Sequence, residues 1–357
     1  MAFQSAAGYG NLPNGNFSSV IYSKKVQLAF RKKSLATDIT NSDFIGELNS
    51  QGDTVKIIKE PEISVSSYAR GTQIAAQDLD DEDFSLTIDK ANYFAFKIDD
   101  IEEAHSHVNF MDLATNRAAY RLADQLDQEV LGYLSGYKQT TLHTAAGTVN
   151  NIVNGTKAVE SAGSDELLAS MKLIKGKFGN ITTASAADHS IPVAARLPGA
   201  TALPTAYVSP VMLINRMARL LDQQNVDKDG RWLVIDPVMM EILADEDSRF
   251  LNADFGEDGA LRNGLVIPKW NGFRVYESNN LPSVGTGPAT TGSANQNTDY
   301  GVIVAGHDSA VASAEQINKT ETYRDPDSFA DIVRGMHLYG RKILRPEALV
   351  TAKYNLA

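Results

Sequence analysis

The feature that most constrains the fold is an alternating stretch of sequence that runs directly into a long amphipathic helix. In two runs between residues 84 and 98 an apolar side chain takes every second position. These positions are Phe84, Leu86, Ile88, Phe94, Phe96 and Ile98. Such alternation predicts strands with one buried face. Because Val55, Ile57, Ile63 and Val65 show the same pattern, residues 53–99 are predicted to form a long two-stranded ribbon.

A ribbon of this length is at best marginally stable alone in water, and its edges invite pairing with other chains. We therefore expect residues 53–99 to form an extended β-hairpin loop that lies across a neighbouring subunit.

The helix that follows is predicted over residues 109–135. Its apolar residues recur at intervals of three and four positions, which places them in one stripe. They are Met111, Ala114, Ala118, Leu122, Leu126, Val130 and Tyr133. Asp124 and Asp127 are among the polar residues that this pattern places off the stripe. At 1.5 Å per residue the helix is a rod of roughly 40 Å, long enough to brace one side of a domain.

Composition sets the class of protein. A chain of 357 residues is near the limit of a single core, so two or three sub-domains are expected. No run approaches the roughly 18 apolar residues that a membrane helix needs, and the first residues lack the features of a signal peptide. The absence of cysteine removes disulfides, thiol nucleophiles and thiolate metal sites. We expect a protein made in the cytosol and stabilised by packing and association.

Charge is unevenly distributed along the chain. The net charge of -11 argues against a reader of nucleic acid. Residues 1–60 hold seven basic and five acidic side chains, whereas residues 78–103 hold ten acidic and two basic ones. Both segments could be solvated faces, as most charge runs are. Alternatively they meet between subunits, and the candidate contacts are then Lys24, Lys25, Arg31, Lys32, Lys33, Asp78, Asp80, Asp81, Glu82 and Asp83.

The remaining chain divides by composition. Residues 1–52 contain too little apolar sequence for a core of their own and are predicted to form an N-terminal arm. Residues 136–205 are rich in Gly, Ser, Thr and Ala, resemble an insertion, and offer a helical pattern only at 165–176. Alternating helical and strand patterns over 206–310 predict an α/β layer domain. Residues 311–344 read as two long strands, and 345–357 close the chain.

Enzyme motifs are absent from the sequence: it has no phosphate-binding glycine loop, no nucleophile elbow and no zinc-protease helix motif. Three local groups contain suitable residue types. Glu102, Glu103, His105 and His107 could bind zinc, Asp78, Asp80 and Glu82 resemble the start of a calcium loop, and residues 306–309 contain His, Asp and Ser. A strand-to-helix junction, a solvated acidic run and a turn are the simpler interpretations. We expect no enzyme activity, no cofactor and no metal.

The join between ribbon and helix resembles the major capsid proteins of tailed bacteriophages, in which a "spine" helix follows an extended loop. Further segments resemble that family in the family's order. They are Asp236–Met240, Arg249–Phe255, Leu261–Gly264, Gly272–Pro282, Ala305–His307 and Arg345–Ala348. The resemblance implies an α+β, Hong Kong 97-like fold with an N-terminal arm (1–52), an extended loop (53–99), a peripheral domain (100–205 and 311–344) and an axial domain (206–310). Residues 345–357 then return to the axial domain.

The same resemblance implies a function. The chain would assemble into hexamers and pentamers that close an icosahedral head around double-stranded DNA, contacted non-specifically. Implied partners are a scaffolding protein, a portal protein and a cement protein, with no membrane. Because residues 1–52 leave no room for a helical scaffold domain, we expect a separate scaffold and no N-terminal cleavage. The alternatives are an encapsulin-like nanocompartment shell, which would hold an enzyme cargo, and, more distantly, an enzyme of another fold.

Overall fold

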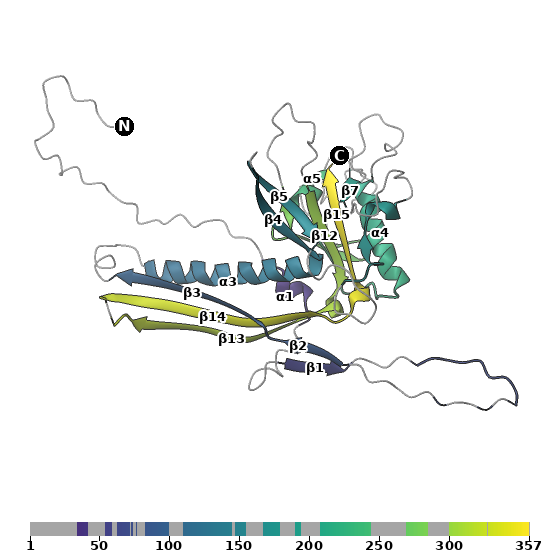
Figure 1. Ribbon diagram of the computed structural model, residues 1–357, viewed down its shortest axis with the longest axis horizontal. Helices are drawn as coiled ribbons and strands as arrows, with labels where there is room; N and C mark the ends of the chain where they lie inside the picture. The colour runs from purple at the N-terminus through teal and green to yellow at the C-terminus, as the bar shows by residue number, and fades with distance from the viewer. Residues whose placement is uncertain are drawn as a thin grey trace, which may run out of the picture.

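The computed structural model forms an L-shaped body (Figure 1). It describes residues 34–41, 54–58, 63–71, 73, 76, 83–99, 110–144, 147–154, 167–178, 190–193, 208–243, 269–284, 300–326 and 328–356. One limb of the L is a long three-stranded sheet with a helix lying along it, and the other is an eight-stranded sheet that stands at its end. No helix among the described residues is long and apolar enough to cross a membrane.

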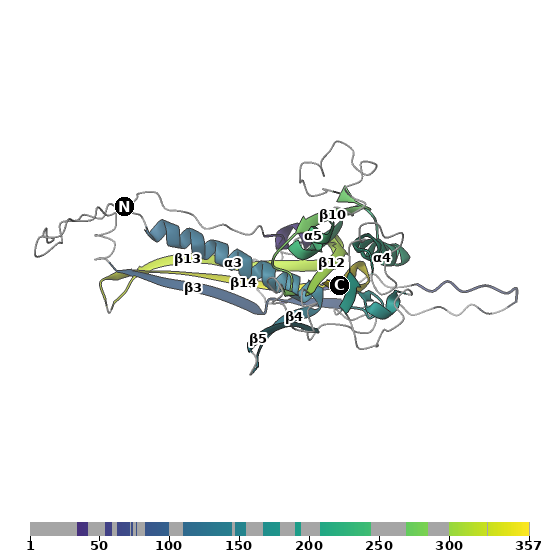
Figure 2. The same ribbon diagram turned by 90° about the horizontal axis from the view of Figure 1, so that it is seen from above.

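The three-stranded sheet has the antiparallel order β13-β14-β3. Its strands are β13 (Val311–Arg324), β14 (Ala330–Ile343) and β3 (Lys90–Asp99). Helix α3 (Phe110–Ser135), the predicted long helix, runs along one face, as Figures 1 and 2 both show. Phe94 on β3 packs against β14 where Gly335 lies, and a Cβ at Gly335 would overlap the Phe94 ring. The long hairpin therefore needs glycine at this position.

The predicted ribbon is shorter than its sequence pattern indicates. Strand β1 (Thr54–Ile58) pairs with β2 (Asp83–Thr87), as expected, but β3 pairs with β14 instead of continuing along the outward strand. The assignment of residues 90–99 to the ribbon is therefore wrong. Alternation reports that one face of a strand is buried and does not identify its partner strand. Here Phe94 and Phe96 are half-buried in the sheet under α3.

The eight-stranded sheet has the order β6-β15-β12-β8-β10-β9, and in addition β7 pairs with β15 and β11 with β12. Its strands are β6 (Lys172–Leu173), β7 (Ser190–Val193), β8 (Arg231–Ile235), β9 (Lys269–Trp270), β10 (Phe273–Glu277), β11 (Ser283–Val284), β12 (Tyr300–His307) and β15 (Leu349–Leu356). Strand β15 lies beside β12 and contributes the chain's C-terminal segment to the middle of the sheet.

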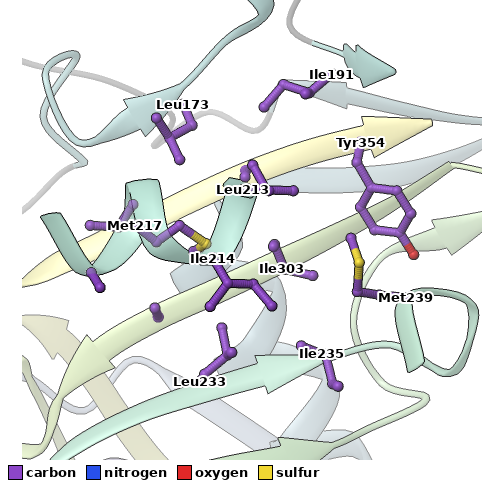
Figure 3. Packing of buried hydrophobic residues seen from close by; sticks show 14 of the residues in the cluster. Leu173, Ile191, Leu213, Ile214, Met217, Leu233, Ile235, Met239, Ile303 and Tyr354 are labelled. Carbon is purple, nitrogen blue, oxygen red and sulfur yellow. The ribbon is translucent and has the colours of Figure 1, made fainter. Parts of the chain in front are cut away.

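Both faces of this sheet are covered, which explains the fully buried pattern of β8. On one face Leu233 and Ile235 pack with helices α4 (Pro210–Gln223) and α5 (Pro237–Leu243). Figure 3 shows Leu213, Ile214 and Met217 of α4 lying over Leu233 and Ile303. On the other face Trp232 and Val234 pack with the C-terminal half of α3 and with α1 (Ala36–Ile39). The core on this second face also contains Tyr339 and Ile343 of β14, so it joins the two limbs at the corner of the L.

The segment after α3 contains a hairpin that composition did not predict. Strand β4 (Tyr137–Thr144) pairs with β5 (Gly147–Asn154) as a separate two-stranded sheet. The helix expected over 165–176 is wrong for the described residues 167–176, which contain β6 and the start of a 3-10 turn, η1 (Lys175–Lys177). In this segment the Lys177 ammonium binds the carbonyls of Ala169 and Ser170 at 2.9 and 2.7 Å. An α-helix would use both carbonyls for its own amides. Two further 3-10 turns are η6 (Asp308–Ala310) and η7 (Pro346–Ala348).

Candidate assembly surfaces

The first candidate surface is the extended loop, which we define as β1, β2 and the described residues 63–71 between them. It projects from the corner of the L, away from the long limb (Figures 1 and 2). It carries large apolar side chains that are exposed to solvent. Ile58, Ile63 and Tyr68 are exposed, and Val65 is 97% exposed. Such exposure does not stabilise a single subunit. Exposed apolar groups of this kind mark interaction sites.

The second candidate surface is the face of the three-stranded sheet that points away from α3; we call it the outer sheet face. Tyr93 lies directly opposite Met336 on this face, and Tyr93 is 81% exposed. Tyr323 adds a second exposed ring, over which the Arg334 guanidinium lies at 4.9 Å from the centroid. Phe329, which lies between β13 and β14, is also exposed. The outer sheet face thus combines exposed apolar side chains with two ion pairs, Arg334 with Glu321 at 2.9 Å and Lys97 with Asp325 at 2.7 Å.

The predicted charged contacts are only partly visible. Asp83 begins β2, and its carboxylate binds the Lys56 ammonium of β1 at 2.7 Å. The hydrogen bond from Lys56 lowers the pKa of Asp83. Asp83 thus has a partner within its own chain. The other nine predicted residues lie outside the described part of the chain: Lys24, Lys25, Arg31, Lys32, Lys33, Asp78, Asp80, Asp81 and Glu82.

The local groups with catalytic residue types do not form a catalytic site where they are described. His307 Nδ1 lies 2.8 Å from Ser309 Oγ, and its Nε2 lies 2.8 Å from the Asp229 carbonyl. Asp308 pairs with Arg274, so its carboxylate is not available to orient the imidazole. Residues 306–309 are thus a turn capped by His307, as expected. No cluster of potential metal ligands occurs among the described residues. The groups at 102–107 and 78–82 fall outside them.

Polar side chains connect α3 to the sheet beneath it. Glu129 of α3 binds Arg341 of β14 at 2.8 Å, and the Arg341 guanidinium lies 4.8 Å from the centroid of the Tyr133 ring. Farther along the sheet, His337 Nε2 lies 3.4 Å from Glu315, and this hydrogen bond lowers the pKa of the Glu315 carboxyl. These contacts fix the helix and the hairpin in one register.

Two carboxylates of α3 contradict the sequence expectation. Asp124 and Asp127, predicted to lie off the apolar stripe, are buried. The buried face of α3 is wider than that stripe, because Leu131 and Leu134 are also fully buried. Asp127 lies four and seven positions before these two leucines, which places it on their side of the helix. This spacing is the signal in the sequence that would have identified Asp127 as an internal residue.

The architecture can now be compared with known proteins. The family model for phage capsid protein matches residues 59–352. Among solved structures, a protein of Mycobacterium phage Che8 is 25% identical with a TM-score of 0.65, over 95% of this chain and 97% of that chain. No curated protein matches the chain.

Two further solved structures share the fold at lower identity. The capsid structure of cyanophage P-SCSP1u is 20% identical with a TM-score of 0.63, over 97% of each chain. The capsid of cyanophage Pam1 is 14% identical with a TM-score of 0.63, over 99% of each chain. None of these matches supports the nanocompartment alternative. The family match over most of the chain, together with the L-shaped Hong Kong 97-like fold, shows that this chain belongs to the phage capsid protein family and is a major capsid protein.

Proposed function

We propose that copies of this capsid protein join head to tail, with the extended loop of one copy packed on the outer sheet face of the next. The observation that carries this proposal is the position of the two surfaces. The described tip of the extended loop and the far end of the three-stranded sheet lie at opposite ends of the molecule in both views (Figures 1 and 2). One chain cannot bring them together, so each surface needs a second copy.

A contact between two different surfaces of the same chain repeats around a ring when its rotation closes. Rings of five and six copies, which the family resemblance implies, would then build an icosahedral head. Burying a large apolar side chain contributes about 1.5–3 kcal/mol, so Ile63, Val65 and Tyr68 together can supply a substantial part of each contact. Assembly of this kind requires binding and no chemical step, which fits a structural protein.

The contents and partners of the shell follow from the family. We propose that the head encloses double-stranded DNA, held without specific contacts, and the net charge of -11 favours a wall along which DNA can move. A scaffolding protein during assembly, a portal protein and a cement protein are proposed partners. Synthesis would take place in the cytoplasm of the host bacterium.

We also propose a division of the chain that keeps most of the predicted boundaries. Residues 1–52 form the arm, 100–205 and 311–344 the peripheral domain, 206–310 the axial domain, and 345–357 the return to the axial domain. Residues 53–89 remain in the extended loop, while 90–99 move to the peripheral domain because β3 pairs with β14.

A triple variant tests the head-to-tail contact: Ile63→Ser, Val65→Ser and Tyr68→Ser. Its matched control is Ser66→Ala with Ser67→Ala, two exposed residues of the same loop. We expect the triple variant to fold, with unchanged circular dichroism, and to remain as free subunits in sedimentation velocity, while the control forms closed particles. Normal particles from the triple variant would contradict the proposed contact.

A further inference from the structure

The carboxylate of Asp127 lies where three parts of the chain meet. Asp127 belongs to α3 and is 0% exposed. Its Oδ1 accepts hydrogen bonds from the backbone amides of Leu35 and Ala36 at 2.7 and 2.8 Å. Its Oδ2 accepts one from Asn280 Nδ2 at 2.7 Å. The Ser34 hydroxyl lies 3.4 Å from Oδ1. A single side chain therefore connects the N-terminal segment, the long helix and the loop after β10.

The Asn280 amide extends this junction to a second carboxylate. Its Nδ2 also donates to Asp124 Oδ1 at 3.1 Å, and Gln128 donates to the other oxygen of Asp124 at 3.2 Å. The Asn280 backbone amide donates a hydrogen bond to the Ser278 hydroxyl oxygen at 3.2 Å. The side-chain amide of Asn280 thus holds the loop between β10 and β11 against α3.

The far end of the N-terminal segment is held at a different place. The Asn41 amide donates to the Val311 carbonyl at 2.8 Å, and the Ser313 amide donates to the Asn41 carbonyl at 3.0 Å. Thr40 Oγ1 lies 2.7 Å from Ser313 Oγ. Residues 34–41 therefore bridge from α3 to the first residues of β13, across the corner of the L. We call this segment the strap.

The end of the strap at Asp127 is the more important one for electrostatics, because the strap there supplies hydrogen-bond donors to a buried carboxylate. A buried carboxylate is tolerated only when hydrogen-bond donors satisfy it. If Leu35 and Ala36 moved away, Asp127 would lose two donors in a site that water does not reach. Hydrogen bonds to a charged acceptor are also about twice as strong as neutral ones.

From these contacts we infer that Asp127 is the positioning residue that anchors the strap, and so fixes this part of the N-terminal arm on the body of the subunit. Leu35, Ala36 and Ile39 pack into the corner core beside this anchor. Apolar packing holds the strap near the corner, and the directional bonds to Asp127 set its register. The anchor does not depend on the proposed head-to-tail contact.

The test is hydrogen exchange, read by mass spectrometry on peptides that cover residues 34–41 of the full-length subunit. Asp127→Asn keeps the size of the side chain and removes its charge. We expect exchange at the Leu35 and Ala36 amides to rise by about tenfold or more, with β8 and β12 unchanged. Glu129→Gln is the matched control on the same helix, because Glu129 contacts Arg341 and not the strap. It should leave the strap's exchange unchanged.

Asn280→Ala gives a second reading if Asp127→Asn fails to fold. It removes the Nδ2 donor from Asp127 and should speed exchange in the strap by about threefold or more. Strap exchange within twofold of the wild type in Asp127→Asn would overturn the anchor. So would an equal rise in the strap and in β8, since Asp127 would then support only global stability. Because exchange is read on subunit amides, a failure of shell assembly cannot be mistaken for a failure of the anchor.

Discussion

The hydroxyl of Tyr354 on β15 donates a hydrogen bond to the carboxylate of Asp236 at the end of β8, and both side chains are completely buried. The same oxygen of Asp236 accepts the Met239 amide at 3.3 Å, at the start of α5. The second oxygen lies against Gly301, where a Cβ would overlap it. Asp236 thus connects three strands and a helix of the eight-stranded sheet.

The first prediction concerns the pH dependence of stability. Burial raises the pKa of Asp236 from 3.8 to about 6. Because the folded pKa lies above the unfolded one, the stabilisation is fully present below about pH 4 and is lost as the pH rises through about 6. A shift of about two pKa units corresponds to about 3 kcal/mol. In Asp236→Asn the free energy of unfolding should fall less between pH 4.5 and pH 7.5 than in the wild type, as measured by urea unfolding of dissociated subunits.

Tyr354→Phe is the informative companion variant. The Tyr354 hydrogen bond lowers the pKa of Asp236, so its removal should move the pH transition to higher pH. An unchanged pH profile in both variants would mean that Asp236 does not titrate in this range.

The second prediction compares two glycines of β14. A Cβ at Gly335 would overlap the Phe94 ring, whereas a Cβ at Gly340 would overlap the backbone carbonyl of Thr87. Overpacking typically costs about 1–3 kcal/mol. Gly335→Ala should lose about that much stability in urea unfolding, and Phe94→Leu in the same chain should restore part of it. Gly340→Ala should cost at least as much and should not be rescued by Phe94→Leu. Equal rescue of both glycine variants would contradict this explanation.

The third prediction concerns the ion pair between Glu129 and Arg341. Arg341→Met leaves the Glu129 carboxylate without its partner between α3 and the sheet. Because Glu129 is partly exposed, we expect a loss of about 1–3 kcal/mol, less than for a fully buried pair. Adding Glu129→Gln should recover part of this loss. The two residues are not coupled if Glu129→Gln lowers the free energy of unfolding by the same amount in Arg341→Met as in the wild type.

The fourth prediction concerns the basic residues of the arm. If they meet an acidic neighbour, reversing Lys24, Lys25, Arg31, Lys32 and Lys33 to Glu should abolish assembly at physiological salt. Single surface pairs contribute only about 0–1 kcal/mol, so Lys24→Glu alone should have little effect in light-scattering assays of assembly. A single change with the full effect would indicate a specific buried pair instead.

Regular periodicity made much of the fold predictable. The helix expected over residues 109–135 is α3 (Phe110–Ser135), because a long stripe of apolar residues leaves few alternatives. Pro210 lies in the first turn of α4, where proline is favoured. A local pattern does not identify the strand with which a segment pairs, so it could not show that β3 pairs with β14. The same limit applies to Asp127, whose burial depends on amides that lie 91 and 92 residues away in the sequence.

The outer sheet face and the extended loop became recognisable only in three dimensions. In the sequence Val65 is one of the alternating apolar residues, and Tyr93 lies one position before another of them, Phe94. The alternation does not show which of these side chains remain exposed in a single subunit. The structure separates them: Tyr93 and Val65 face outward, whereas Phe94 packs on Gly335.

Electron cryomicroscopy of purified particles of the full-length protein tests the central claim most directly. The account predicts closed icosahedral shells in which Val65 and Tyr68 of each copy lie on the outer sheet face of the next copy, against Tyr93 and Met336. Subunits that stay separate at every concentration, or closed shells in which this sheet face is bare, would contradict it.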